Sequence, residues 1–499
     1  MKPAAEKSEA IEPAVRAILD DVAIHDDGLA FVHNYANWVM ALRKLPPKEN
    51  SRVFIQLAVL AKQYFDAGCN PVAGSLAALA RIGLPHLMKE TIFIQIAAYR
   101  DPQLIPTIDD CISMASDPQR LRFGICNQTD NPADLNKYSR DPRFRIVYVP
   151  HGNSKGVCWA RWLIQKLYYQ NETYTLQLDS HHRFVKGWDE KLISMIKQLQ
   201  SKGHKKPLIT TYAPNFDPLN DPKERTQEAT IMKFDAFTPE GAVSFRPLEV
   251  TNSTELTQPI PARFYSAHFA FTLGQMCVEV PHDPNYYFDG EEISIGVRAY
   301  THGYDLFHPN EIILWHEYTR NYRTHAHWKD HPSVAPKLNR AAHKRNRILF
   351  GMEPNVDHID FGEYGFGTER TLSEFEQYAG VRFKDRSVQQ YTLQDKRAPN
   401  PIDDDWVLQV KHFIALPKKI FVENDYELWR VEFHDAFGNS LYREDADKDE
   451  IQQLLSTKDD FVAIMRRFVV DTLPVGWVVR PFSASKGWCG SISETISYE

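Results

Sequence analysis

Residues 174–182, YTLQLDSHH, contain both a strand and a candidate ligand pair. The short apolar run YTLQL is typical of a buried strand in a parallel sheet. It is followed by Asp179 and His181, and alternate residues of an extended chain point to the same side, so both side chains can reach one ion. A carboxylate and a neutral imidazole suit Mn²⁺, with phosphate oxygens and water as further ligands, whereas Mg²⁺ prefers oxygen ligands alone. The alternative is an ordinary polar loop.

A third metal ligand must come from another part of the chain, and His316 is the candidate. It follows the strand-like run EIILW, as Asp179 follows YTLQL. The alternative is a histidine that only packs or faces solvent.

Strands and helices alternate along the middle of the chain, which predicts an α/β fold with a parallel sheet. In such sheets ligands bind outside the carboxyl ends of the strands, where this chain repeatedly places polar residues. The expected strands are 91–98, 121–127, 145–149, 174–178 and 208–212, and the expected helices are 106–115 and 157–169.

Three regions are expected: a helical region at 1–88, the α/β domain at 89–400 and a small, separate β-rich domain at 401–499. Apolar spacing through Phe31, Trp38, Val39 and Leu42 indicates the first of these. Within the other two we expect a polar excursion over 216–260, a helix over 289–300, strands over 306–314, 419–422 and 428–433, and a helix over 461–470.

Composition excludes several classes of protein. The net charge of −7 argues against a dedicated nucleic-acid binder. The six cysteines form no CxxC pair, and the N-terminal residues contain no apolar run typical of a secretory signal. The longest apolar runs are too short to span a bilayer. These features predict a cytoplasmic protein without a membrane span.

Basic and acidic side chains supply further candidates. Arginine suits phosphate because its guanidinium donates bidentate hydrogen bonds. The alternative for each candidate below is an ordinary surface charge. Carboxylates at 289–292 would cap a helix or contact sugar or acceptor hydroxyls. The candidate phosphate ligands are Arg100, Lys155, Arg161, Arg320 and Arg323.

Six stretches in this order resemble the GlcNAc-transferase family, which includes cytosolic protein-hydroxyproline N-acetylglucosaminyltransferases that modify a ubiquitin-ligase adaptor. The resemblance covers about residues 90–380 and extends, more distantly, to polypeptide GalNAc-transferases. It implies a GT-A fold, a UDP-GlcNAc donor, a divalent metal and retention of anomeric configuration. The stretches are IFIQIAAYRDPQLIPTIDDC, GICNQ, GVCWARWLIQKLY, YTLQLDSHHRFVKGWDEKLI, YFDGEEISIGVRAYTHGYDLFHP and WHEYTR.

The resemblance also implies roles for individual residues. Asp179 and His181 match the family's Asp-x-His, and His316 matches its later metal-binding histidine. Arg161 matches an arginine near the diphosphate, and Arg320 is a second candidate there. The uridine is expected at Ala98, Tyr99, Arg100, Asp101 and Asn127, and the sugar or acceptor at Ala267, His268, Glu291 and Glu292.

The expected activity is metal-dependent transfer of GlcNAc to a hydroxyl of a protein or glycan. We favour front-face attack, with the departing phosphate oxygen taking the acceptor proton; the alternative is a covalent intermediate on Glu291 or Glu292. The competing functions are transfer from UDP-GalNAc or UDP-Glc for bacterial polysaccharide synthesis, a non-catalytic sugar-nucleotide-binding protein, and a metal hydrolase. Acceptor identity and self-association stay open.

Overall fold

A computed structural model describes residues 13–24, 42, 47–66, 76, 79, 90–250, 256–323, 325–457, 459–496 and 498. The chain forms two compact units. The first comprises residues 1–92 with 170–173, and the second comprises residues 93–169 with 174–499. Among the helices that the structure describes, none is long and apolar enough to cross a bilayer.

The first unit contains helices α1 (Pro13–Ile24) and α3 (Pro47–Asp66), which lie within the region expected to be helical. Val15, Ile18, Phe54 and Leu57 are buried. The expected helical positions Phe31, Trp38 and Val39 lie outside the described residues.

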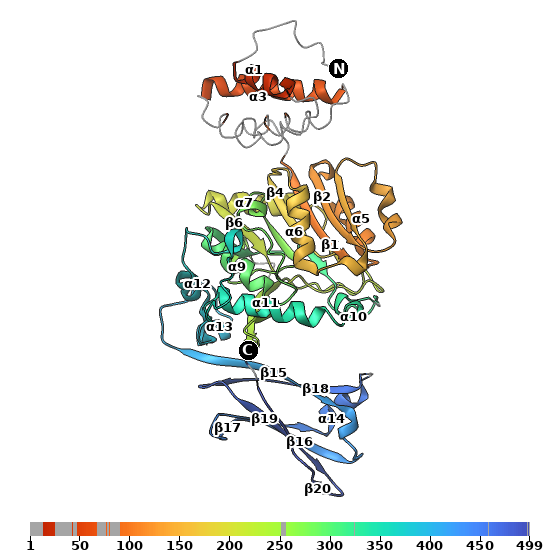
Figure 1. Cartoon of the computed structure of the whole chain (residues 1–499), viewed down its shortest axis with the longest axis vertical. Coiled ribbons are helices and arrows are strands. Elements are labelled where there is room, and N and C mark those ends of the chain that lie inside the picture. The colour runs from red at the N-terminus through yellow and green to blue at the C-terminus, as the bar shows by residue number, and fades with distance from the viewer. Residues whose placement is uncertain are drawn as a thin grey trace. The chain divides into compact units, whose positions relative to one another are not determined.

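An eight-stranded sheet with flanking helices forms the α/β core (Figure 1). Its strand order is β3-β2-β1-β4-β10-β6-β11-β9. The strands are β1 (Ile92–Tyr99), β2 (Leu121–Gln128), β3 (Phe144–Val149), β4 (Tyr174–Leu178), β6 (Lys206–Thr210), β9 (Ile260–Pro261), β10 (Phe269–Leu273) and β11 (Tyr304–His308). The helices are α5 (Leu104–Met114), α6 (Val157–Tyr168), α7 (Trp188–Ser201), α8 (Met276–Glu279), α9 (Glu291–Thr301), α10 (His327–Asp330), α11 (Ala335–Leu349), α12 (Leu372–Ala379) and α13 (Gln390–Leu393).

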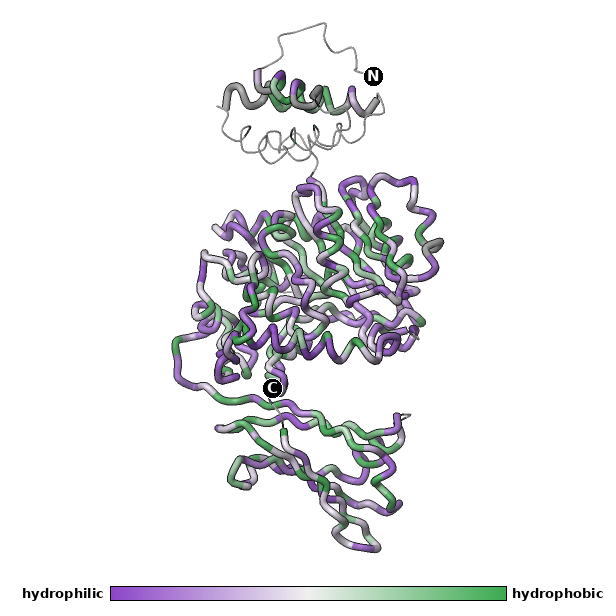
Figure 2. Tube along the Cα trace, viewed as in Figure 1, coloured by the Kyte–Doolittle hydropathy of each residue, from purple (hydrophilic) through white to green (hydrophobic). Residues whose placement is uncertain are grey.

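The strands and helices expected between residues 89 and 213 are present, and the α/β class is confirmed. The sheet is mixed rather than parallel, because β10 pairs antiparallel with both β4 and β6. Figure 2 shows hydrophobic residues along the interior strands and hydrophilic residues along the outer loops. Helices α6 and α9 bury apolar side chains against this sheet, including Ile164 on Phe93 and Ile295 on Tyr304.

A second sheet corrects the expectation that residues 216–260 form only a polar excursion. This segment contains the antiparallel pair β7 (Thr230–Phe237) and β8 (Val243–Glu249). The sheet has the order β13-β14-β15-β7-β8, with β13 (Val381–Arg382), β14 (Ser387–Gln389) and β15 (Trp406–Pro417). The prolines and charges masked the strand pattern, and β7 also pairs with β15, which is distant in sequence.

The C-terminal residues are β-rich, as expected, but the helix predicted over 461–470 is wrong. Phe461–Val470 is strand β18, because its buried and exposed residues alternate with period two. The helix there is α14 (Lys448–Ser456). Residues 418–420 form a 3₁₀ turn rather than the expected strand. The remaining strands are β16 (Tyr426–His434), β17 (Ser440–Asp447), β19 (Gly476–Ser483), β20 (Gly487–Trp488) and β21 (Ile492–Thr495).

The β-rich region shares both a strand pairing and buried charges with the core. Val410 of β15 pairs with Phe237 of β7. Asp235 of β7 is 2% exposed and lies 2.6 Å from both Lys411 Nζ and Arg467 Nη2. The boundary at residue 400 stays a prediction, but β15 is an integral strand of the sheet that contains β7.

We therefore expect Asp235→Asn to lower the free energy of unfolding by about 3 kcal/mol, because it removes the buried carboxylate that three cations share. Urea denaturation measures this loss. The matched control is Asp445→Asn, which breaks an exposed pair with Arg430 and should cost less than about 1 kcal/mol. Equal, small losses in both variants would contradict a stabilising role for the buried pair.

Candidate active site

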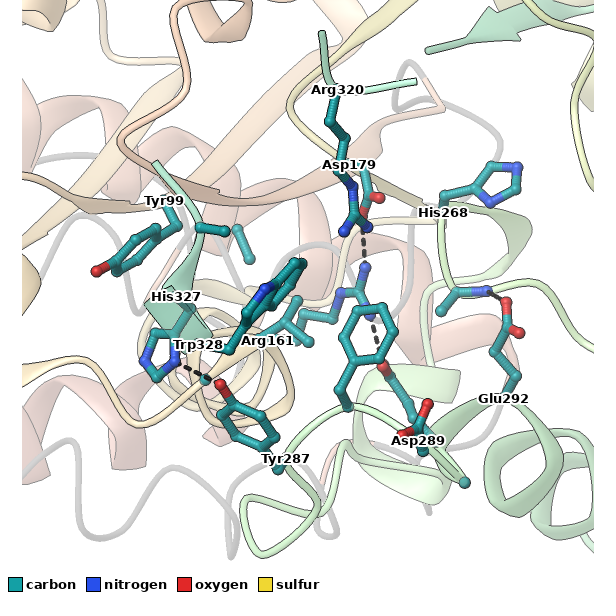
Figure 3. Close-up of a pocket in the computed structure, with 18 of the residues that line it drawn as sticks. Tyr99, Arg161, Asp179, His268, Tyr287, Asp289, Glu292, Arg320, His327 and Trp328 are labelled. Atoms are coloured by element: carbon teal, nitrogen blue, oxygen red, sulfur yellow. Dashed lines mark hydrogen bonds and ion pairs between the residues drawn. The ribbon is translucent and has the colours of Figure 1, made fainter. Parts of the chain in front are cut away.

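A cavity of about 410 Å³ lies beside the carboxyl end of β4. Its walls come from the ends of β1 and β4, the starts of α6 and α9, the β7–β8 pair, and residues 316–328. Figure 3 shows Arg161 at the centre of the lining residues, with Asp179, Arg320 and Trp328 around it. The expected location at strand ends therefore coincides with this cavity.

Asp179, His181 and His316 form a group that could hold a metal ion. One ligand atom from each lies within 4.8 Å of the others. Asp179 and His181 follow β4, and His316 ends strand β12 (Leu314–His316), which pairs antiparallel with β5 (His182–Phe184). That pairing brings two segments separated by more than 130 residues to one point. Asp179 Oδ2 is 3.4 Å from His316 Nε2 and 3.7 Å from His181 Nε2.

Asp101 orients His181. Its Oδ2 lies 2.8 Å from His181 Nδ1 and also accepts a hydrogen bond from Ser180 Oγ at 2.7 Å. With Nδ1 donating to a carboxylate, Nε2 of His181 keeps its lone pair, and this buried atom has no hydrogen-bond partner among the described residues. A carboxylate behind an imidazole is the usual support of a metal-binding histidine. The residues therefore fit a metal ion.

Arg161 is buried and joins Asp179 to α9. Its Nη2 donates to Asp179 Oδ1 and its Nη1 donates to Glu291 Oε1, both at 2.6 Å (Figure 3). Burial opposes the ionisation of Asp179, but the hydrogen bond from His316 and the charge of Arg161 hold the pKa of Asp179 well below its usual value. Asp179 is therefore an anion, as a metal ligand must be.

Glu291 and Glu292 occupy different environments, although they are adjacent at the start of α9. Burial opposes ionisation of Glu291, but Arg161 and His282 lower its pKa to about 2. Burial raises the pKa of Glu292 to about 7, although Tyr212 OH and the Ala267 amide donate to its carboxyl at 2.6 and 2.8 Å. Neither carboxyl is a solvated helix cap. Capping was the simpler of the two interpretations of the sequence, the other being contact with sugar or acceptor hydroxyls.

The raised pKa of Glu292 predicts a pH effect on stability. The folded chain binds this proton more tightly than the unfolded chain, whose glutamate has a pKa of 4.5. The contribution of Glu292 to the free energy of unfolding is thus complete below pH 4.5. It decreases as the pH rises to about 7, by on the order of 3 kcal/mol at most. We expect the stability of Glu292→Gln relative to wild type to increase from pH 5 to pH 7.5.

Urea denaturation of both proteins at the two pH values measures this difference. Histidines such as His268 and His316, whose pKa values are lowered by burial, titrate in both proteins and cancel. A difference that is constant with pH would show that Glu292 is ionised throughout.

His268 and Ala267 line the cavity, as the sequence predicts for the sugar or acceptor pocket. The ring of His268 stacks on His316 at 4.1 Å, and its Nε2 accepts a hydrogen bond from the Ala213 amide. His268 therefore also fixes the ring plane of His316.

Two of the candidate phosphate ligands besides Arg161 line the cavity, namely Arg320 and Arg323. Arg320 lies over the Trp328 ring at 5.3 Å, and Arg323 Nη1 donates to Asp101 at 3.2 Å. Arg100 instead donates to Asp330, and Lys155 lies over the ring of Trp159.

Of the residues expected to hold the uridine, Tyr99 lines the cavity. Ala98, Arg100, Asp101 and Asn127 are not among its lining residues; Ala97 and Gln128 are. Side chains alternate along a strand, so the positions next to the predicted ones face the cavity. The binding roles of these residues stay predictions.

Several lining residues were missed from the sequence. Trp328 and His327 lie in the basic, His-rich segment that the sequence displays but that periodicity does not place. Tyr287 donates its hydroxyl hydrogen to His327 Nδ1 at 2.7 Å (Figure 3). Tyr212 and Phe245 come from segments without a recognisable motif. Only the folded chain brings these aromatic rings to one cavity.

A sequence model of the family described as "Glycosyltransferase (GlcNAc)" matches residues 91–142 and 131–385. The chain belongs to this glycosyltransferase family. The matched residues include Arg161, the three candidate metal ligands and both α9 glutamates. No curated protein matches the chain.

Among solved structures, the chain is similar to "GalNAc-T7 with UDP, GalNAc and Mn2+" at 11% identity and a TM-score of 0.40, over 57% of this chain and 56% of that one. It is also similar to S. aureus "TarS 1-349 in complex with UDP-GlcNAc" at 11% identity and a TM-score of 0.31, over 50% of this chain and 64% of that one. The chain thus spans less than two thirds of each of these two.

Proposed function

We propose that this glycosyltransferase moves GlcNAc from UDP-GlcNAc to an acceptor hydroxyl in a metal-dependent reaction. The observation that carries the proposal is the convergence of Asp179, His181 and His316 on the wall of a cavity that also contains Arg320. The family description names GlcNAc, which supports this sugar. Nucleotide sugars are made in the cytoplasm, so the reaction is proposed to take place there.

Asp179, His181 and His316 would hold the metal ion. The mixture of one carboxylate and two imidazoles favours Mn²⁺ over Mg²⁺. When bound, a divalent cation supplies positive charge that stabilises the departing diphosphate. Arg320 would donate charge-assisted hydrogen bonds to the same phosphates, and Arg161 would keep Asp179 ionised and in place.

The reaction would retain the configuration at the anomeric carbon by front-face attack. Glu291 Oε1 accepts from Arg161 and Glu292 accepts from Tyr212 and Ala267, so both carboxyls already have partners. These bonds favour positioning roles over that of a covalent nucleophile. Tyr99 and its neighbours would hold the uridine, and Ala267 and His268 the sugar.

A UDP-release assay tests the function. The purified chain is incubated with UDP-GlcNAc, UDP-GalNAc or UDP-Glc, with Mn²⁺, with Mg²⁺ or with EDTA. We expect Mn²⁺-dependent release of UDP that is fastest from UDP-GlcNAc. Metal-independent release, or no release from any of the three donors, would overturn the proposal.

The acceptor is proposed to be a hydroxyl of protein hydroxyproline or of a glycan. Mass spectrometry of a cell extract treated with the enzyme and UDP-GlcNAc identifies it by an added N-acetylhexosamine. Modification on hydroxyproline peptides supports the first class, and modification of released glycans supports the second.

A further inference from the structure

The segment from Tyr286 to Gly290 presents two exposed side chains to the cavity. Phe288 is 49% exposed and the side chain of Asp289 is 50% exposed, and both line the cavity. Their neighbours are fixed, because the buried Tyr286 donates its hydroxyl hydrogen to Asn346 Oδ1 at 3.4 Å and a Cβ at Gly290 would lie 2.9 Å from the same oxygen. Phe288 and Asp289 are therefore held at both ends while their side chains face the cavity.

Asp289 differs from the other three carboxyl groups that line the cavity. Asp179 and Glu291 each accept a hydrogen bond from Arg161. Glu292 accepts one hydrogen bond from a tyrosine hydroxyl and one from a backbone amide. These three groups already have partners within the chain, and Asp179 is also a candidate metal ligand.

The carboxyl group of Asp289 keeps one oxygen for a ligand. Its Oδ2 lies 3.4 Å from both His343 Nε2 and Asn339 Nδ2, which extend from α11. Among the described residues, none donates a hydrogen bond to the other oxygen, Oδ1. This oxygen is therefore available to a hydroxyl group of a bound molecule.

The position of Asp289 separates it from the diphosphate. Figure 3 shows Asp289 on the side of Arg161 away from Asp179. The diphosphate would bind at Asp179 and the other metal ligands, and a carboxylate repels phosphate, so Asp289 is not suited to hold that part of the donor. The transferred sugar already has Ala267 and His268 as its proposed contacts, which leaves the acceptor for Asp289.

Phe288 and Asp289 together offer the chemistry that binds a sugar ring. The face of an aromatic ring is electron-rich and attracts the C–H groups of a pyranose. A carboxylate oxygen accepts hydrogen bonds from hydroxyl groups, of which a pyranose carries several. Val243 and Phe245 of β8 line the same cavity and extend its apolar wall. The cavity thus combines aromatic surface with one free carboxylate oxygen.

We propose that Phe288 and Asp289 form the acceptor subsite and that the acceptor is a glycan. A sugar ring packs on Phe288, and a hydroxyl beside the attacked one donates to Asp289 Oδ1. In the transfer the bond from C1 of GlcNAc to UDP breaks, the acceptor oxygen bonds to C1, and its proton passes to the departing phosphate. The inference rests on the proposed function and narrows its acceptor to one of the two classes.

Hydroxyproline fits this subsite less well than a sugar does. It carries one hydroxyl, which would be the nucleophile, and its nitrogen carries no hydrogen within a chain. The residue therefore has no hydrogen left to donate to Asp289 Oδ1, whereas a sugar keeps its remaining hydroxyls. This difference favours a glycan over a protein acceptor.

The first test measures UDP release from UDP-GlcNAc and Mn²⁺ in the presence of possible acceptors. The acceptors are methyl glycosides of glucose, galactose, mannose, GlcNAc and GalNAc, and a peptide that contains hydroxyproline. We expect at least one glycoside to accelerate UDP release and to gain an N-acetylhexosamine by mass spectrometry. Acceleration by the peptide alone, or by no glycoside, would overturn the inference.

Substitutions of the two side chains test the subsite itself. We expect Phe288→Ala and Asp289→Asn each to raise the KM for the active glycoside about tenfold. The KM for UDP-GlcNAc should change much less, and Phe288→Tyr should keep the low KM for the glycoside because it keeps the aromatic face. A merely structural role would raise both KM values together.

The matched controls are Asp357→Asn and Phe437→Ala. Asp357 is a half-exposed carboxylate that pairs with Lys344, and Phe437 is 91% exposed; neither lines the cavity. Both variants should leave the two KM values unchanged. Equal rises in the glycoside KM of the controls and of the subsite variants would contradict a role for Phe288 and Asp289.

Saturation-transfer NMR of the active glycoside, or of all five glycosides if none is active, reports binding to the chain without turnover. We expect the signal to be present with wild type and lost with Phe288→Ala, and equal signals would overturn the inference. Wild type that releases no UDP from any donor but shows this difference in glycoside binding would overturn the proposed function alone.

Discussion

Asp179→Ala should reduce sugar transfer about 1,000-fold or more. The substitution removes a metal ligand and the carboxylate that pairs with Arg161. Metal stabilisation of a departing diphosphate contributes several kcal/mol, and each 1.4 kcal/mol corresponds to a tenfold change in rate. UDP release at saturating UDP-GlcNAc and Mn²⁺ measures the loss, and the rise in melting temperature on adding Mn²⁺ with UDP should disappear as well.

The matched control is Asp109→Ala. It removes a half-exposed carboxylate of α5 that pairs with Lys137. It should retain wild-type turnover and the Mn²⁺-dependent rise in melting temperature. His181→Ala should behave like Asp179→Ala. Near-normal turnover in both single variants, Asp179→Ala and His181→Ala, would contradict the assignment of this metal site.

The sequence predicts Asp179 and His181 together because their relation is local. Residues two apart after a buried strand point to one side, and this holds whatever the rest of the chain does. Apart from the family resemblance, His316 was predicted only as a histidine after another strand. Its position opposite His182 depends on the β5–β12 pairing, and three-residue strands leave almost no periodicity to recognise.

The missed strands have a common physical cause. The β7–β8 pair and β18 contain charged residues such as Asp235 and Arg467, which lowers their apparent hydrophobicity. The strand partner of β18 and the ion-pair partners of Asp235 are distant in sequence. Strand preference depends on such partners more than helix preference does, so single-sequence patterns recover α6 and α9 more readily than β18.

The two α9 glutamates illustrate the same limit at the site. Their sequence position at a helix start predicts capping or sugar contact equally well. The folded chain gives Glu291 a buried arginine and Glu292 a tyrosine hydroxyl and a backbone amide. Arg161 and His282 lower the pKa of Glu291 against the effect of burial, whereas burial raises the pKa of Glu292 despite its two hydrogen bonds.

Arg161→Met should cost on the order of 3 kcal/mol of stability, because it leaves the buried Glu291 and the partly buried Asp179 without their shared cation. Turnover should fall with it, since an unpaired Asp179 no longer has a fixed direction. Urea denaturation and UDP release measure the two effects. Arg443→Met, which removes an exposed arginine, is the control and should change stability by less than about 1 kcal/mol.

A second substitution separates the two roles of Arg161. In Arg161→Met/Glu291→Gln one of the two orphaned carboxylates is gone, so we expect part of the lost stability to return. Activity should not return, because Asp179 still lacks the guanidinium that orients it. Stability losses that simply add in the double variant would show that Arg161 and Glu291 do not interact energetically, since substitutions of residues in one ion pair are non-additive. Recovery of both stability and turnover would instead show that Arg161 only neutralises Glu291 and contributes nothing to the metal site.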